Sequence, residues 1–501
     1  MPKHPTYEYW FLTGSQNLYG EDVLRQVDAD SQKIVDGLNN DSAVGARFVF
    51  KPVLTTPESI LGTCREANAD PKCAGVICWM HTFSPAKMWI AGLRELAKPL
   101  CHFHTQLHRD IPWDRIDMDY MNLHQSAHGG REFGFLISRL RRERKVVVGH
   151  WEDPDTRAEL AGWCRTAAGW ATLRNLKVVR FADNMRQVAV TDGDKVEAQM
   201  QLGFSVNTHP VGELVDVIGQ QSDADIDALC QEYADTYKVV PALLKGGDRH
   251  DSLREAARIE LGHRSFLESN GFDAFVNCFE DLTGMDQLPG LPVQRLMQEG
   301  YGFGPEGDWK SAALVRAMKV MAGPEDKGTS FMEDYTYHLD PRGERCLGAH
   351  MLEICPSLAA GTPACEVHPL FVGGKSDPVR LTFDGKPGLA SNACLIDMGN
   401  RFRLLISEVE AVEPQAALPN LPVARVLWKI MPDLKTGAAA WIHAGGAHHT
   451  AFSYSVRTDQ LQDLADMADI ESIVIDEGTD LRDFRNELRW NEAAYGLKGL
   501  S

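Results

Sequence analysis

The sequence predicts an α/β protein of two or three domains, and three observations support this fold class. The chain has 501 residues, more than the roughly 250 to 300 that one hydrophobic core usually supports. Its composition, with 44% hydrophobic and 24% charged residues, is typical of a globular protein. In the first third, short apolar runs alternate with amphipathic segments, as in βαβ units. We therefore expect a doubly wound parallel sheet at the N-terminus, with helices on both faces.

The first third predicts strands separated by helices. Helices are expected where apolar residues recur at helical spacing, first over 21–40 and later from Thr56 and from Ser84. By the usual rule for such sheets, the loops TGSQNLYG and WMHTFSPAKMW should face a ligand crevice. The strands are expected at 9–14, 46–53, 74–80, 99–104 and 145–150.

The pattern changes twice along the rest of the chain. After a strand at 176–184 it is mainly helical, and beyond about Gly328 it is rich in short strands, which include 329–337, 350–354 and 401–412. The chain closes with a strand at 472–476 and a helix at 480–490. We predict three domains: a Rossmann-like α/β domain over 1–175, a central α/β domain over 176–327 and a β-rich domain over 328–501.

Charge and cysteine usage exclude several classes of protein. The formal net charge of −19 would repel nucleic acid and anionic membranes. The 11 cysteines form no C-x-x-C pair, which favours buried thiols in a reducing compartment over a zinc site. The N-terminus lacks the apolar core of a signal peptide, and no run of 18 apolar residues occurs. We expect a cytoplasmic protein that binds neither nucleic acid nor a membrane.

Residues 302–307, GFGPEG, match the pattern G-x-G-x-x-G of a dinucleotide-binding loop. A true fingerprint needs a strand immediately before it, whereas the upstream residues 291–301 have helical spacing. Glu306 would also repel a diphosphate, and Pro305 removes a backbone donor. The pattern instead favours a tight loop that presents Glu306, with Asp308, from the start of a helix. A solvated glutamate on a surface loop is the simpler alternative.

Acidic residues and histidines recur in apolar segments of the last third. FMEDYTYH (331–338) places Glu333 and Asp334 on opposite faces of an expected strand, and LGAHMLEICPS (347–357) places His350 in another. AAWIHAGGAHHTAFSYS (439–455) adds three histidines around a Gly-Gly turn: His443, His448 and His449. Buried charges usually have a partner or a metal.

Two carboxylates and two imidazoles would suit Mn²⁺ or a similar borderline ion better than an all-oxygen or a thiolate site would. Each group also has a structural alternative. A histidine on an apolar strand is often a core residue, and a buried glutamate often pairs with arginine.

Nine blocks of the sequence resemble L-arabinose isomerases, and the resemblance extends from about residue 8 to RWNEAAYG (489–496). The blocks are TGSQNLYG (13–20), WMHTFSPAKMW (79–89), FHTQ (103–106), IDMDYMNLHQSAHGGREFGF (116–135), RFADNMRQVAVTDGDKV (180–196), GYGFGPEGDWK (300–310), GTSFMEDYTYH (328–338), HMLEICPS (350–357) and AGGAHHT (444–450).

This resemblance implies a cytoplasmic enzyme of arabinose catabolism, an intramolecular oxidoreductase that converts L-arabinose to L-ribulose and commonly D-galactose to D-tagatose. It implies one Mn²⁺ per subunit, with Co²⁺ or Mg²⁺ as substitutes, and no nicotinamide. It also implies a fucose isomerase-like fold with a β-barrel-like C-terminal domain, and a homohexamer built as a dimer of trimers.

Carried over by position, the resemblance assigns the metal ligands and the residues of the sugar site. The metal ligands are Glu306, Glu333, His350 and His449, and Glu306 and Glu333 are also the acid/base pair. The residues expected to line the sugar site are Gln16, Gln125, His128, Met185 and Phe279. Of these, Gln125 and His128 are expected to reach the site of a neighbouring subunit.

An aldose and a ketose interconvert through a cis-enediol by proton transfer alone, a task for two opposed carboxylates. Two other readings stay open: a nicotinamide-dependent sugar dehydrogenase and a non-catalytic sugar-binding protein of the periplasmic type. The sequence leaves the preference between pentose and hexose undetermined.

Overall fold

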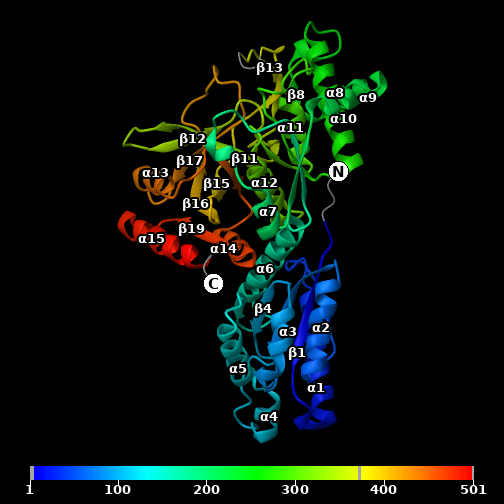
Figure 1. Cartoon of the computed structure of the whole chain (residues 1–501), viewed down its shortest axis with the longest axis vertical. Coiled ribbons are helices and arrows are strands. Elements are labelled where there is room, and N and C mark those ends of the chain that lie inside the picture. The colour runs from blue at the N-terminus through cyan, green and yellow to red at the C-terminus, as the bar shows by residue number, and fades with distance from the viewer. Residues whose placement is uncertain (1–4, 371–373, 499–501) are drawn as a thin grey trace. The chain divides into compact units, whose positions relative to one another are not determined.

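The computed structural model describes residues 5–370 and 374–498, and the chain divides into two compact units (Figure 1). One unit ends at Ala171 and the other begins at Thr172. None of the helices in these residues is long and apolar enough to cross a membrane. The division into three domains at 175 and 327 stays a prediction.

The first unit contains a five-stranded parallel sheet in the order β2-β1-β3-β4-β5, which confirms the predicted N-terminal α/β architecture. This order reverses direction between β1 and β3, where such sheets form a ligand crevice. The strands are β1 (Glu8–Gly14), β2 (Arg47–Phe50), β3 (Cys73–Met80), β4 (Leu100–His104) and β5 (Lys145–Val148). The helices are α1 (Gly20–Asn39), α2 (Pro57–Ala69), α3 (Ile90–Glu95), α4 (Met118–Leu123), α5 (Ser126–Arg139) and α6 (Pro154–Leu173).

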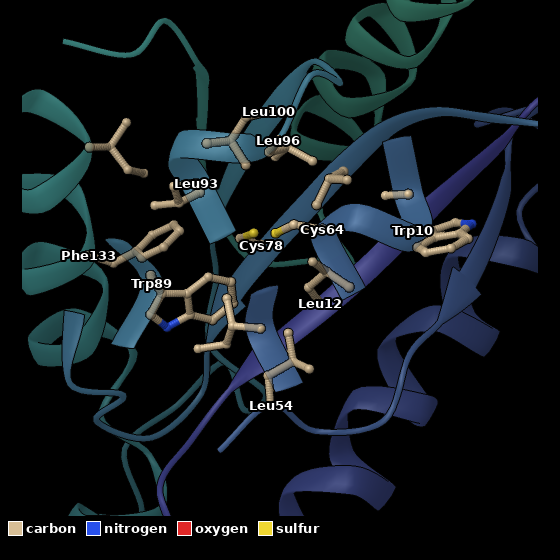
Figure 2. Packing of buried hydrophobic residues seen from close by; sticks show 14 of the residues in the cluster. Trp10, Leu12, Leu54, Cys64, Cys78, Trp89, Leu93, Leu96, Leu100 and Phe133 are labelled. Atoms are coloured by element: carbon tan, nitrogen blue, oxygen red, sulfur yellow. The ribbon is translucent and has the colours of Figure 1, made fainter. Parts of the chain in front are cut away.

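Helices cover both faces of this sheet. Neighbouring side chains of β1 point to opposite faces, and on each face they pack against helices. Trp10 and Leu12 belong to a buried cluster with side chains of α2, α3 and α5 (Figure 2). Tyr9 points to the other face, where its ring contacts Trp163 of α6 and its hydroxyl donates to the carbonyl oxygen of Cys164. The sheet is therefore doubly wound, as predicted.

The second unit begins with a four-stranded parallel sheet in the order β10-β9-β6-β7. Its strands are β6 (Lys177–Phe181), β7 (Ser205–His209), β9 (Ala274–Val276) and β10 (Gly302–Gly304). The helices of this region are α7 (Lys195–Gln201), α8 (Val211–Gly219), α9 (Asp223–Thr236), α10 (His250–Asn270), α11 (Gly290–Gln298) and α12 (Trp309–Ala322).

A mixed seven-stranded sheet follows, in the order β15-β18-β11-β12-β17-β16-β19. Strand β15 also pairs with β16, so six of these strands form a closed ring of pairings, called the ring below. The ring strands are β11 (Thr329–His338), β12 (Arg345–Ala349), β15 (Gly388–Asp397), β16 (Phe402–Val412), β17 (Arg425–Ile430) and β18 (His449–Ser453). Strand β19 (Glu471–Ile475) pairs in parallel with residues 403–407 of β16, next to the residues 409–412 that pair with β17.

A small third sheet joins the two parts of the second unit. Strand β8 (Lys238–Val239), which lies between α9 and α10 in the chain, pairs with β13 (Ala364–Val367), and β13 pairs with β14 (Val379–Thr382). Because this sheet takes strands from both sides of residue 328, the central and C-terminal parts form one compact unit.

Two expectations for the last third were wrong. Residues 350–354 are not a strand: β12 ends at Ala349, and the chain leaves the sheet to place Leu352 and Ile354 in the core. The β-rich reading also overlooked two helices, α13 (Leu434–His443) and α14 (Thr458–Ala468). The expected closing strand and helix are present as β19 and α15 (Leu481–Lys498).

Candidate metal centre

The residues before the G-x-G-x-x-G segment form helix α11, as their helical spacing predicted, and a short strand lies inside the segment rather than before it. Strand β10 consists of Gly302–Gly304, and α12 begins at Trp309. A strand this short has no periodicity to detect. A Cβ atom on Gly302 or Gly304 would clash with the carbonyl oxygens of Ala312 and Asp308, so the glycines allow α12 to pack closely on the strand.

Glu306 occupies the turn between β10 and α12 in a strained conformation. Its φ of 55° lies in the left-handed region, which costs a residue other than glycine about 1 kcal/mol or more. Hydrogen bonds hold the turn on both sides: the backbone N–H of Met185 donates to the carbonyl oxygen of Glu306 (2.9 Å), and that of Gly307 donates to Asn277 (2.9 Å). Such strain is characteristic of functional sites.

The other carboxylate, Glu333, is the direct cross-strand partner of His449 in the antiparallel pair of β11 and β18. Directly opposed residues of such a pair share one face, and Oε1 of Glu333 lies 3.1 Å from Nε2 of His449. His350, the first residue after β12, places its Nε2 atom 3.3 Å from the same oxygen. Glu333 thus lies between two imidazoles.

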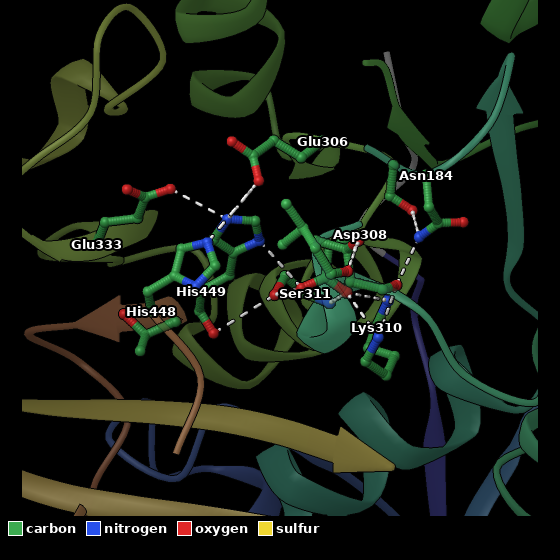
Figure 3. A network of polar contacts seen from close by, with 12 residues as sticks. Asn184, Glu306, Asp308, Lys310, Ser311, Glu333, His448 and His449 are labelled. Carbon is green, nitrogen blue, oxygen red and sulfur yellow. Dashed lines mark hydrogen bonds and ion pairs between the residues drawn. The ribbon is translucent and has the colours of Figure 1, made fainter. Parts of the chain in front are cut away.

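Glu306 completes the cluster from the side of α12 (Figure 3). Its Oε2 atom lies 3.7 Å from Nε2 of His449 and 3.8 Å from Nε2 of His448. His449 is fully buried, whereas the side chain of His448 is 46% exposed. The structure therefore brings Glu306, Glu333, His350 and His449 together, with His448 at the rim.

His449 and His350 are both oriented through their second ring nitrogen. Nδ1 of His449 lies 3.1 Å from Oδ2 of Asp308, the residue that caps α12 and contacts Lys310 (Figure 3). Nδ1 of His350 lies 2.5 Å from Oε2 of Glu353. Histidines that bind metals usually have such a carboxylate partner, which leaves the Nε2 atom free for the ion.

The charges of the cluster perturb one another. Burial lowers the pKa of His350, but Glu353 and Glu333 raise it to about 9. Burial likewise opposes protonation of His449, whose pKa Asp308 and Glu333 raise to about 9. Burial would raise the pKa of the Glu333 carboxyl, yet His350 and His449 lower it overall. The two histidines therefore favour the ionised form of Glu333.

The polar atoms that face the middle of the cluster fit a cation. Oε2 of Glu306, Oε1 of Glu333 and Nε2 of His449 are buried and have no hydrogen-bond partner within the described residues. The two oxygens lie 3.7 and 3.1 Å from Nε2 of His449 without hydrogen-bond geometry. Glu306, His448 and His449 by themselves offer ligand atoms within 4.8 Å of one another. Orphaned oxygen and nitrogen atoms that converge on one point are what a divalent ion requires.

Two predicted sugar-site residues lie on loops beside Glu306. Met185 hydrogen-bonds to Glu306 through its backbone, and Phe279 is two residues beyond Asn277, which bonds to Gly307. An ion pair between Arg186 and Glu280 (2.9 Å) joins these two loops. Both Met185 and Phe279 are half-buried, so their side chains retain exposed surface next to the carboxylate.

The other three predicted sugar-site residues gather in the first unit. The side-chain nitrogen of Gln125 donates to the hydroxyl of Tyr19 (3.1 Å), and the side-chain oxygen of Gln125 lies 3.1 Å from Nδ1 of His128. Tyr19 is three residues after Gln16 in the chain. Gln125 and His128 line a cavity of about 460 Å³ whose wall includes Tyr120. Gln125 and His128 thus contact each other within the first unit, and Gln16 lies in the same unit, one turn before Tyr19.

Sequence reasoning did not assign roles to three residues at the centre. Asp308 was expected only to accompany Glu306 at the start of a helix, and Glu353 was given no part in the site. Tyr335 was not considered, although burial and the charges of Glu333 and Glu306 raise the pKa of its hydroxyl, which places it near both carboxylates. Its position two residues after Glu333, on the same face of β11, was the signal that could have identified it.

Comparison with known proteins gives a consistent result along the chain. Residues 3–175, 177–324 and 328–471 match the L-arabinose isomerase N-terminal, central and C-terminal domain families. The chain belongs to the L-arabinose isomerase family. It is 62% identical over 98% of both chains to the L-arabinose isomerase of Anoxybacillus flavithermus, and 62% identical, again over 98% of both, to that of Geobacillus stearothermophilus.

More distant L-arabinose isomerases also align over nearly their whole length. The L-arabinose isomerase of Klebsiella pneumoniae is 55% identical, with 98% of this chain and 99% of the relative covered. The segments that carry the cluster, from Glu306 to His449, all fall inside the matched central and C-terminal domains. The candidate metal centre therefore belongs to the part of the chain that defines this family.

Proposed function

We propose that this chain is an aldose–ketose isomerase that converts L-arabinose to L-ribulose. The observation that carries the proposal is its 62% identity, over nearly the full length, to proteins named L-arabinose isomerase. The two convergent carboxylates, Glu306 and Glu333, supply the groups that this reaction needs.

The proposed metal ligands are Glu306, Glu333, His350 and His449, with one Mn²⁺ per subunit and Co²⁺ or Mg²⁺ as substitutes. Two oxygen and two nitrogen donors suit Mn²⁺ and leave positions for sugar hydroxyls. His449 is preferred to His448 because it is buried and oriented by Asp308. The bound ion supplies electrostatic stabilisation of the negative charge that develops on the sugar oxygens.

Glu306 and Glu333 act as the acid/base pair of the proposed reaction. One group, as a carboxylate, removes the proton from C2 of the aldose, and the other, as a carboxylic acid, protonates the carbonyl oxygen on C1, which gives the cis-enediol. Loss of the proton of the C2 hydroxyl and delivery of a proton to C1 then give the ketose. The strained turn at Glu306 and the strand pairing at Glu333 fix the two groups on separate elements of one compact unit. No hydride acceptor is needed for this exchange.

We extend the proposal to the sugar site and the assembly. Met185, Phe279, Gln16, Gln125 and His128 line the sugar site, and the last two reach the site of a neighbouring subunit in a homohexamer of two trimers. D-Galactose is the proposed second substrate, giving D-tagatose. The cytoplasm, where the eleven buried free cysteines stay reduced, is the proposed location. The closed ring of strands would then be the β-barrel-like part of a fucose isomerase-like fold.

The test is incubation of the purified chain with L-arabinose and Mn²⁺ in the absence of any nicotinamide. We expect a ketose to accumulate, and removal of the metal by a chelator to stop its formation. Absence of ketose together with a sugar-dependent reduction of added NAD would favour the dehydrogenase alternative. Tight binding of L-arabinose with no product of either kind would favour a sugar-binding protein.

A further inference from the structure

A group of polar side chains lies on the face of β11 opposite the candidate metal centre. Because side chains alternate along a strand, Asp334 points away from the face that carries Glu333. The side-chain N–H of Asn392 on β15 donates to Oδ1 of Asp334 (3.2 Å), and the thiol of Cys346 on β12 lies beside this carboxylate. We call Asp334, Asn392 and Cys346 the anchor.

The anchor connects strands that are not neighbours. Strand β18 separates β15 from β11, so the Asn392 side chain spans the concave side of the ring to reach Asp334. Asn392 is only 2% exposed and Cys346 is fully buried. Asp334 itself is half-buried, and its carboxylate beside these buried side chains is stabilised by a hydrogen-bond donor.

The strand geometry at Asp334 is irregular. The pairing of β11 with β12 changes register between Asp334 and Thr336, directly after Glu333. An irregularity of this kind twists the strand and re-aims the side chains beside it, and it is frequent next to active sites. The position of Asp334 therefore influences the direction in which Glu333 points.

A small cavity accompanies the anchor. Asn392, Asp334, Ser407 and Trp428 line a cavity of about 10 Å³, a size that holds one water. Oδ1 of Asn392 and Nε1 of Trp428 are buried and have no protein partner within the described residues. One acceptor and one donor without partners, beside a carboxylate, are suitable partners for a single water.

We propose that Asn392 is a positioning residue for Glu333. Together with one internal water, Asn392 anchors Asp334 inside the ring. This anchoring fixes the register shift of β11 beside Asp334 and so aims Glu333 at His350 and His449. This inference rests on the proposed function, because its consequence is measured on the metal and on turnover. A carboxylate that must lie 3.1 and 3.3 Å from two imidazoles tolerates little displacement.

The test variant is Asn392→Leu in the full chain, which keeps the side-chain size but removes the amide. We expect the dissociation constant for Mn²⁺, measured by calorimetric titration, to rise about 10-fold, and kcat at saturating Mn²⁺ to fall. The double variant D334N/N392D exchanges the two groups and restores one hydrogen bond between them, so it should recover most of the affinity. Should N392L not fold, Asn392→Ser, which is too short to reach Asp334, takes its place.

Ser391→Ala is the matched control. Ser391 is the neighbouring residue of β15, is equally buried, and its hydroxyl donates to the carbonyl oxygen of Val456 (2.8 Å) on the other face. We expect S391A to lower the unfolding temperature as N392L does, but to bind Mn²⁺ like the unmodified chain. If N392L also binds Mn²⁺ and turns over like the unmodified chain, the inference is wrong, and so it is if the double variant behaves like N392L.

The unmodified chain separates this inference from the proposed function. If it binds no Mn²⁺ and forms no ketose, the proposed function fails and the inference fails with it. If it does both while N392L is unimpaired, only the inference fails. A crystal structure of the full chain should show one water within hydrogen-bond distance of Oδ1 of Asn392, and an empty cavity there would overturn the role of the water.

Discussion

Replacing Glu333 by glutamine should remove most of the turnover while the chain still folds. The side chain is 8% exposed, and its Oε1 atom lies 3.1 and 3.3 Å from the Nε2 atoms of His449 and His350. Glutamine keeps the shape but removes both the negative charge and the capacity to accept a proton. Loss of a general acid or base lowers kcat by about 10²-fold or more, which corresponds to roughly 2.7 kcal/mol in the activation free energy.

The assay is the initial rate of ketose formation from L-arabinose at saturating Mn²⁺, after a calorimetric titration has established the Mn²⁺ affinity of the variant. Saturation separates a loss of acid/base chemistry from a loss of metal. Glu410→Gln is the matched control. Glu410 pairs with Lys429 (2.6 Å) on the same ring, its side chain is 38% exposed, and its loss should leave kcat unchanged. Turnover of E333Q equal to that of the unmodified chain would refute the assignment of Glu333.

Three further predictions follow from the same geometry. His449→Ala should weaken Mn²⁺ binding at least about 10-fold in a calorimetric titration, and an unchanged affinity would point to His448 as the ligand instead. Glu306→Gly should abolish ketose formation yet maintain or raise the unfolding temperature, because glycine adopts a φ of 55° without strain; a large drop in that temperature would contradict this. Burial lowers the pKa of His263 to about 4. Between about pH 6.5 and about pH 4, His263 is therefore protonated in the unfolded chain but neutral in the native chain. Stability should therefore fall as the pH drops from about 6.5 to about 4, and His263→Leu should show a smaller difference in unfolding temperature between about pH 7 and about pH 5.

The N-terminal sheet could be predicted from the sequence because each strand is a short apolar run followed by a turn. The run at 74–80 corresponds to β3, and the run at 9–14 corresponds to β1, each within a residue or two. Both faces of a parallel sheet are buried, so such strands stand out from the amphipathic helices between them. Strand β10 has three residues and two glycines, and its existence depends on pairing with β9.

The candidate site was predictable in its residue types more than in its arrangement. Glu306 could be singled out because a carboxylate is incompatible with a phosphate-binding loop, and Glu333 because it interrupts an apolar strand. Asp308 could not be assigned in the same way, because an acidic residue at the start of a helix is most simply a cap. It is a cap here, and it also orients His449.

By itself, the sequence determined the α/β architecture of the first unit, the β-rich character of the last third, and the family to which the chain is similar. These follow from local periodicity and from long blocks of residues. Only the tertiary structure decided that Glu333 and His449 are cross-strand partners and that Asn392 reaches Asp334 across the ring. The physical reason is that strand register and ring closure depend on contacts between segments far apart in the chain, which no local pattern specifies.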